Sequence, residues 1–141
     1  MADLYVTIKE EISLLNVPKT LTNVFHTFSG INYVDTRLMS CPSGSKTEIF
    51  SLSNTIGAGQ FVTSSLQYAR ITNDSTVPVK LIVSSSTVNT SFLISTGSSF
   101  YLSTSKITGS ADNSFSLEDI QQVLIEPSGS AAKIEYFIAT T

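Results

Sequence analysis

Short runs of alternating apolar and polar residues make up most of this sequence, and this pattern restricts the chain to β-structure. In residues 77–83 every second residue is apolar, so that these side chains share one face of an extended strand. Pro78 cannot donate a hydrogen bond to a neighbouring strand, so we expect it at the start of this strand or on a sheet edge. Turn-forming residues separate the runs, for example at 95–98 and 127–130. Helical periodicity is scarce, and the chain is predicted to be all-β.

The alternation predicts roughly ten short strands. Strands at this turn-punctuated spacing are typical of an antiparallel sandwich or barrel and not of alternating β and α units. The residues Ser116-Leu117-Glu118-Asp119 suit the start of one short helical turn, whereas Ile120 onward fits a strand better. No repeat or boundary divides the chain, so we expect one domain over residues 1–141. The predicted strands are residues 2–9, 21–28, 32–41, 46–52, 60–72, 77–83, 88–94, 99–102, 122–126 and 133–138.

Composition narrows the classes of function. Charged residues make up 13% of the chain, about half of the roughly 25% usual in globular domains, whereas 41 of the 141 residues are Ser or Thr. A surface with few charges is weakly protected against association. Either the protein tolerates such a surface in contact with water, or much of the surface is buried against partners. The eight basic residues are scattered, which argues against a nucleic-acid partner. No stretch suits a membrane helix or a signal peptide, so we expect no membrane contact and synthesis in a cytoplasm.

The residues that usually carry catalysis occur singly. His26 lies in the strand 21–28, in phase with its apolar residues and without a nucleophile motif nearby. Cys41 stands at a strand end and has no basic neighbours that would lower the pKa of its thiol. One Cys and one His exclude an intrachain disulfide and a closed Cys/His zinc site. We therefore predict no catalytic residue, no cofactor and no metal site.

Two groups of acidic residues leave other chemistry open. Calcium is one possibility for the loop residues Asp112, Asn113, Glu118 and Asp119, but their spacing departs from an EF-hand and solvated turn or cap roles fit better. A glycosidase carboxylate pair has no local motif. The strand acids that could form one, and that fit outward-facing positions equally well, are Asp35, Glu48, Glu126 and Glu135.

Apolar residues on the second face of the C-terminal strands interrupt the alternation. A solvated face would carry polar residues there. Three explanations are open: single exposed apolar residues, cover by a loop or by the N-terminal strand, and a subunit interface, which the low charge favours. The strand 2–9 can pair within its own sheet or add to a neighbour's edge, so residues 1–15 are treated as an arm for assembly. The interface candidates are Tyr5, Ile82, Leu93, Tyr101, Leu124 and Phe137.

Most of the chain, and residues 60–139 above all, follows a layout of strands and turns that is familiar from a known group of proteins. The motifs are Val6-Thr7-Ile8-Lys9-Glu10-Glu11, residues 32–40, Tyr68-Ala69-Arg70-Ile71-Thr72-Asn73, Val77-Pro78-Val79-Lys80-Leu81, Phe92-Leu93-Ile94 with Thr96-Gly97-Ser98-Ser99-Phe100, Leu117-Glu118-Asp119-Ile120 and Ile134-Glu135-Tyr136-Phe137-Ile138-Ala139. This layout resembles that of small Ser/Thr-rich virion structural proteins of tailed bacteriophages. The resemblance implies a jelly-roll-like sandwich located in a phage particle, as a capsid decoration or cement subunit, or as a neck, tail or fibre component. It carries over no functional residues.

Three hypotheses of function follow. The leading one is a non-enzymatic structural protein that forms a symmetric homo-oligomer, of which a trimer is one option, and contacts a major capsid or other virion protein. The second is a carbohydrate-binding module for host attachment, in which Tyr5, Tyr33, Tyr68 and Tyr101 serve as aromatic platforms because the chain has no Trp. The third, a hydrolase, requires paired carboxylates in a cleft.

Overall fold

The structure, a computed structural model, consists of β-strands joined by turns. It describes residues 2–20, 24–52, 66–85, 89–103, 107–108, 116–117 and 120–141. In these residues every regular element is a strand and every strand pair is antiparallel. The all-β prediction is confirmed. Within the same residues there is no helix of a length and hydropathy that would cross a membrane.

Each of the ten predicted strands has a counterpart in the structure. They are β1 (Ala2–Ile8), β4 (Val24–Ile31), β5 (Tyr33–Cys41), β6 (Thr47–Ser51), β7 (Leu66–Asn73), β8 (Val79–Ser84), β9 (Asn89–Ile94), β10 (Ser99–Leu102), β13 (Gln122–Pro127) and β14 (Ala132–Thr140). The first part of the predicted strand 60–72 lies outside the described residues. Pro78 directly precedes β8, as the missing N–H donor led us to expect.

Four further short strands were not predicted. They are β2 (Glu11–Leu14), β3 (Val17–Thr20), β11 (Ile107–Thr108) and β12 (Ser116–Leu117). β12 occupies the first half of the expected helical turn at 116–119, so that part of the prediction is wrong: Ser116 and Leu117 pair with β11. Glu118 and Asp119 lie outside the described residues.

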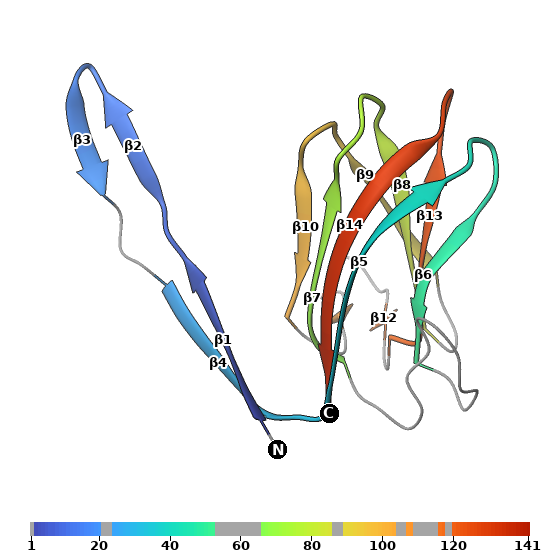
Figure 1. Ribbon diagram of the computed structural model, residues 1–141, viewed down its shortest axis with the longest axis horizontal. Helices are drawn as coiled ribbons and strands as arrows, with labels where there is room; N and C mark the ends of the chain where they lie inside the picture. Colours follow the sequence, from blue (N-terminus) through green and yellow to red (C-terminus); the bar gives the residue numbers. More distant parts are fainter. Residues whose placement is uncertain are drawn as a thin grey trace.

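Eight strands form a sandwich of two sheets (Figure 1). We call the sheet with strand order β10-β7-β14-β5 sheet I, and the sheet with strand order β6-β13-β8-β9 sheet II. When these strands are counted in chain order, sheet I reads 6-3-8-1 and sheet II reads 2-7-4-5. This alternation of strands between two antiparallel sheets is the arrangement of a jelly roll. The β-sandwich prediction is confirmed, and the strand order agrees with the jelly-roll-like arrangement that the resemblance implied.

The hydrophobic core lies between the two sheets. In β14 the residues Ile134, Tyr136 and Ile138 are fully buried and alternate with more accessible positions, as one face of a strand requires. Val79, Leu81 and Val83 of β8 meet them from sheet II. Alternation in the sequence thus selects the inward face of each strand, and burying that face between two sheets stabilises the fold.

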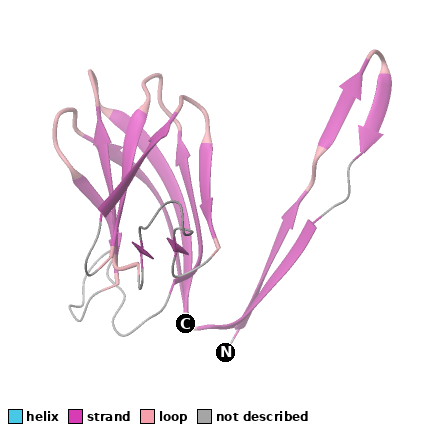
Figure 2. Ribbon diagram, turned by 180° about the vertical axis from the view of Figure 1, so that it is seen from behind, coloured by secondary structure: helices cyan, strands magenta, loops and turns pink. Residues whose placement is uncertain are grey.

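The N-terminal residues form a separate two-stranded ribbon (Figure 2). β1 pairs with β4 and β2 pairs with β3, so that residues 2–20 run out and begin to return, and residues 24–31 return alongside β1. The hairpin turns at Leu15 and Asn16, which both have positive φ, as the two central residues of a type I′ turn do. The strand expected at residues 2–9 is present as β1, and its partner β4 belongs to neither sheet of the sandwich. We call the described residues 2–20 and 24–31 the ribbon.

Candidate functional site

The base of the ribbon packs on the outer face of sheet I. Leu4 and Phe28 lie opposite each other in the β1–β4 register. The ring of Phe28 lies 5.7 Å from the ring of Tyr68, which in turn lies 6.1 Å from the ring of Phe137. Aromatic pairs at such distances contribute about 0.5–1.5 kcal/mol beyond their burial. We call this contact the ribbon junction; its residues are Leu4, Val6, Phe28, Ile31, Tyr68, Phe137 and Ala139.

The ribbon junction explains one of the off-phase apolar residues. Phe137 faces outward from β14, between the buried core residues Tyr136 and Ile138. Its side chain is half-buried because the ribbon covers it, and Ala139 on the same face is fully buried. For Phe137, cover by the N-terminal strand is therefore the explanation among the three that the sequence left open.

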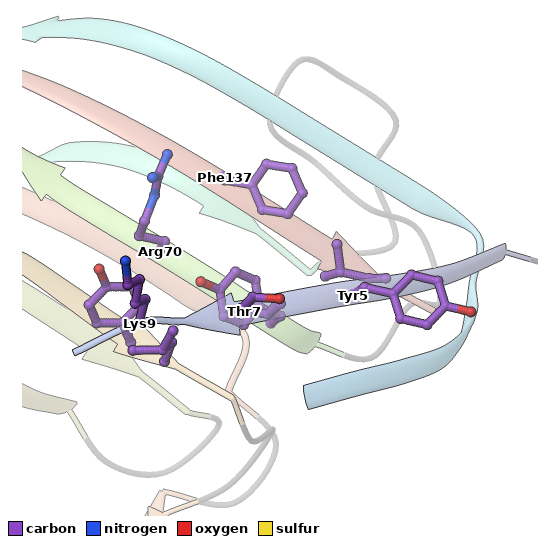
Figure 3. Close-up of a pocket in the computed structure, with 10 residues that line it drawn as sticks. Tyr5, Thr7, Lys9, Arg70 and Phe137 are labelled. Atoms are coloured by element: carbon purple, nitrogen blue, oxygen red, sulfur yellow. The ribbon is translucent and has the colours of Figure 1, made fainter. Parts of the chain in front are cut away.

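Beyond the junction the ribbon and sheet I diverge and enclose a cleft of about 550 Å³. One wall is β1, from Leu4 to Lys9, and the other wall is formed by outward-facing residues of β7, β10 and β14. Figure 3 shows β1 crossing the strands of sheet I beside Arg70 and Phe137. The residues of the sheet wall are Tyr68, Arg70, Tyr101 and Phe137. The wall is thus aromatic with one cation.

The cation of the sheet wall, Arg70, is partly neutralised by its own sheet. Arg70 Nη2 donates a hydrogen bond of 2.7 Å to Glu135 Oε1 on β14. Both side chains are more than a third exposed, so this pair contributes no more than about 1 kcal/mol. Burial, and secondarily the neighbouring Tyr101, raise the pKa of the Tyr68 hydroxyl, while Arg70 lowers it. The Tyr68 hydroxyl therefore stays neutral at physiological pH.

The six interface candidates do not form one patch, but three of them, Tyr5, Tyr101 and Phe137, line the cleft. Tyr5, Leu93 and Tyr101 are exposed, at 71%, 73% and 56%. Leu93 lies on the outer face of sheet II, away from the cleft. Leu124 and Phe137 are half-buried. Ile82 is only 5% exposed and offers almost no surface to a partner.

Sequence reasoning missed the most exposed apolar residues of the ribbon. Leu15 at its turn is 90% exposed and Phe25 is 71% exposed. Phe25 lies next to His26 and out of phase with Phe28, so the only available signal was the presence of apolar residues on both phases of the strand 21–28. On sheet I the edge strand β5 also exposes Val34 and Leu38.

His26 and Cys41 lie in surroundings that suggest no catalytic role. His26 is exposed on the ribbon, with its ring 6.4 Å from that of Phe28. Cys41 is fully buried. Burial raises the pKa of its thiol, and the opposing effect of a hydrogen bond with Thr47 is smaller. The thiol is thus protonated at neutral pH and shielded from reagents.

The strand acids each contact a different polar partner. Asp35 Oδ2 accepts a hydrogen bond of 2.8 Å from the Tyr136 hydroxyl and lies 3.1 Å from Arg37 Nε. Glu48 accepts from Gln122, Glu126 lies 3.6 Å from Lys80, and Glu135 pairs with Arg70. Among the residues with known placement, no three His, Cys, Asp or Glu side chains converge as a metal site would require. The loop residues Asp112, Asn113, Glu118 and Asp119, considered for calcium, lie outside the described residues.

A second groove of about 510 Å³ lies at one end of sheet II. It is lined by exposed Leu93, by the Lys80–Glu126 ion pair and by turn residues including Gly44 and Gly129. The ion pair spans β8 and β13, which are paired in the sheet at these two positions. None of the residues that line this groove belongs to the ribbon, so it is separate from the cleft on sheet I.

Comparisons with known proteins add little to these observations. No protein-family model matches the chain, and no curated protein matches it. Among solved structures, the fold is similar to that of a chain from a structure described by the words "Bacillus endospore appendages form a novel family of disulfide-linked pili". The similarity covers 77% of this chain and 84% of that chain, with 16% identity and a TM-score of 0.45. A likeness at this level supports no conclusion about function.

Proposed function

We propose that this protein is a non-enzymatic structural subunit that associates with copies of itself and with another protein of a larger particle. The observation that supports this proposal is the ribbon, which projects from the sandwich and exposes Tyr5, Leu15 and Phe25 (Figure 1). Large exposed apolar side chains on one projecting element are typical of an interaction surface. The low share of charged residues, 13%, leaves the surface poorly protected against association, which suits a subunit that is buried in an assembly.

The physics of the ribbon supports the same proposal. An isolated two-stranded hairpin is at best marginally stable in water, and a third strand or an opposing layer is needed to hold it. The described part of this chain supplies an opposing layer only at the ribbon junction. A neighbouring subunit would supply the missing layer, and this would make the ribbon an element of the assembly rather than of the monomer alone.

We further propose the narrower role of a capsid decoration or cement subunit in the virion of a tailed bacteriophage, bound to the major capsid protein. This assignment rests on the sequence resemblance, and the jelly-roll topology is compatible with it because viral capsid domains use this fold. Lectin domains and cupins use it as well, so the fold alone does not select the role. A neck, tail or fibre position is the alternative within the same particle.

The test is the oligomeric state of the full chain together with its binding to particles. Sedimentation velocity across a range of concentrations is expected to show an oligomer, and the protein is expected to sediment with purified phage capsids. A matched pair of variants, Phe25→Ser and Thr27→Ser, removes a large and a small apolar group from the same face of β4. Only Phe25→Ser is expected to weaken association. A monomer at all concentrations that does not sediment with particles would rule the proposal out.

Carbohydrate binding is a second candidate, because the cleft brings together Tyr68, Tyr101 and Phe137 beside Arg70. Of these aromatic rings only that of Tyr101 is well exposed, and Tyr33 lies outside the cleft. A glycan array tests this reading: binding that Tyr101→Ala abolishes would support it, whereas an array without hits would remove it.

A further inference from the structure

The ribbon is longer than the sheet on which its base rests. Its outgoing strand runs from Ala2 to Leu14, about 13 residues or ~44 Å at about 3.4 Å per residue. The longest strands of sheet I, β5 and β14, have 9 residues, or about 31 Å by the same rise. Contact with sheet I ends near Val6 and Phe28. The distal half of the ribbon therefore has no covering layer in the described part of its own chain.

Both faces of the ribbon carry apolar side chains. Leu4, Val6 and Ile8 alternate along β1 on the face toward sheet I. On the far face, Tyr5 and Phe25 lie on diagonal positions, because Tyr5 pairs with Thr27 and Thr7 pairs with Phe25. A sheet with apolar residues on both faces is typical of one that is covered on both sides. Within the described residues, only the near face at the base is covered.

We propose that the cleft between the ribbon and sheet I receives the ribbon of a second copy of this chain, so that two copies clasp each other. This inference rests on the proposed assembly function and names its partner and its surface. The walls of the cleft continue the ribbon junction: Ile8 extends the apolar row of β1, and Tyr101 extends the aromatic row that begins with Tyr68 and Phe137. An interface that already joins the ribbon to sheet I inside one chain thus continues into open, chemically similar surface.

The clasp covers the exposed apolar residues of both copies in one arrangement. The layers are sheet I of the first copy, the ribbon of the second, the ribbon of the first and sheet I of the second. The two near faces meet in the middle through Ile8, and each far face, with Tyr5 and Phe25, meets Tyr101 and Arg70 of the other copy. The contact is the same for both copies, as a two-fold axis requires, and it closes as a dimer without forming a filament. Layers of β-structure stack about 10 Å apart, so this arrangement requires the ribbon and sheet I of one copy to stand about two layer spacings apart where the second ribbon enters.

Cysteine cross-linking of the full chain tests the clasp. Two differently tagged variants, Phe25→Cys and Tyr101→Cys, are mixed, oxidised mildly and run on a non-reducing gel. Each variant carries only one of the two new cysteines, so a disulfide between these positions reports contact between copies. The control replaces Tyr101→Cys with Leu93→Cys, which is equally accessible but lies on sheet II. Cys41 is fully buried and does not compete. We expect at least 10-fold more heterodimer from the first pair.

Each outcome decides the matter. Preferential cross-linking of Phe25→Cys with Tyr101→Cys, together with association weakened at least 10-fold by Tyr101→Glu but not by Leu93→Glu, supports the clasp. An oligomer that cross-links equally well or better through Leu93→Cys overturns the clasp and leaves the assembly function standing. A monomer at every concentration overturns both. Glycan binding that depends on Tyr101, without cross-linking, assigns the cleft to a sugar and overturns the clasp.

Discussion

At the scale of single residues, Asn73 holds one end of the sandwich together. It is fully buried at the end of β7, and its Nδ2 donates to the carbonyl oxygens of Val77 and Ile94, at 2.8 and 3.2 Å. Its backbone N–H donates to the carbonyl oxygen of Ser98, and its own carbonyl oxygen accepts from Gly97. One residue thus connects the end of β7, the turn before β8 and the turn between β9 and β10.

We expect Asn73→Ala to lower the free energy of unfolding by about 2–3 kcal/mol, because it leaves buried carbonyl oxygens without a donor. Urea denaturation followed by fluorescence or circular dichroism measures the change. Asn89→Ala, at an exposed position of β9, is the control and is expected to stay within about 0.5 kcal/mol of the unchanged protein. Equal effects of the two substitutions would contradict the assigned role of Asn73.

The Tyr136 hydroxyl makes the free energy of unfolding fall as the pH becomes alkaline. Burial, followed by the hydrogen bond to Asp35 and the charge of that carboxylate, raises the pKa of the Tyr136 hydroxyl above its usual value of 10.0. The folded state therefore keeps a proton that the unfolded state loses, so stability is fully present below about pH 10 and falls as the pH rises further. We expect Tyr136→Phe to show a shallower loss of stability above about pH 10, measured by urea denaturation at several pH values. A slope equal to that of the unchanged protein would contradict this.

At the scale of elements, the ribbon is the part that sequence reasoning described least well. The sequence predicts a strand at residues 21–28 but not that β1 is its partner. Apolar residues on both faces of this strand are compatible with a strand inside the sandwich and with a strand of the ribbon. Gly30, with a φ of 75°, and the register shift between Ala2 and Leu4 mark the place where β4 turns toward β5. Nothing in the alternation of β4 itself indicates that it pairs with β1 instead of a sheet.

The ribbon junction can be tested with two phenylalanines of the same strand. Phe28 packs against Tyr68, whereas Phe25 points to the far face and is exposed. We expect Phe28→Ala to weaken docking of the ribbon by about 1–2 kcal/mol, less than the roughly 3–5 kcal/mol of a fully buried Phe because Phe28 is only half-buried. Hydrogen exchange of the β1 and β4 amides should then be roughly 5- to 30-fold faster, while that of β14 stays unchanged.

Phe25→Ala is the matched control, since it removes the same ring from the opposite face of β4. Measured in the monomer at low concentration, its β1 and β4 amides should exchange at the unchanged rate. If both substitutions accelerate exchange to the same degree, the near face of the ribbon is not what holds it to sheet I.

At the scale of the whole molecule, an assembly subunit ties its stability to its concentration. Association raises the apparent free energy of unfolding by an amount that grows with the ratio of the free protein concentration to the dissociation constant. We expect the apparent Tm of the unchanged protein to rise by a few degrees over a roughly 100-fold increase in concentration, as scanning calorimetry would show. The double variant Phe25→Glu, Tyr101→Glu should show no such rise. A Tm that is constant for both proteins would count against assembly.

Alternation and turn residues act over a few neighbouring residues, so they were sufficient to predict the fold class and ten of the strands, down to Pro78 directly before β8. They did not predict the short strands β2, β3, β11 and β12. The tertiary structure supplies the other features: the strand order of the two sheets, the pairing of β1 with β4, the cover that the ribbon gives Phe137, and the meeting of Tyr101 with β1 in one cleft. These features depend on contacts between residues far apart in the chain, such as Phe28 with Tyr68, and a strand's own pattern specifies which face is buried but not what buries it.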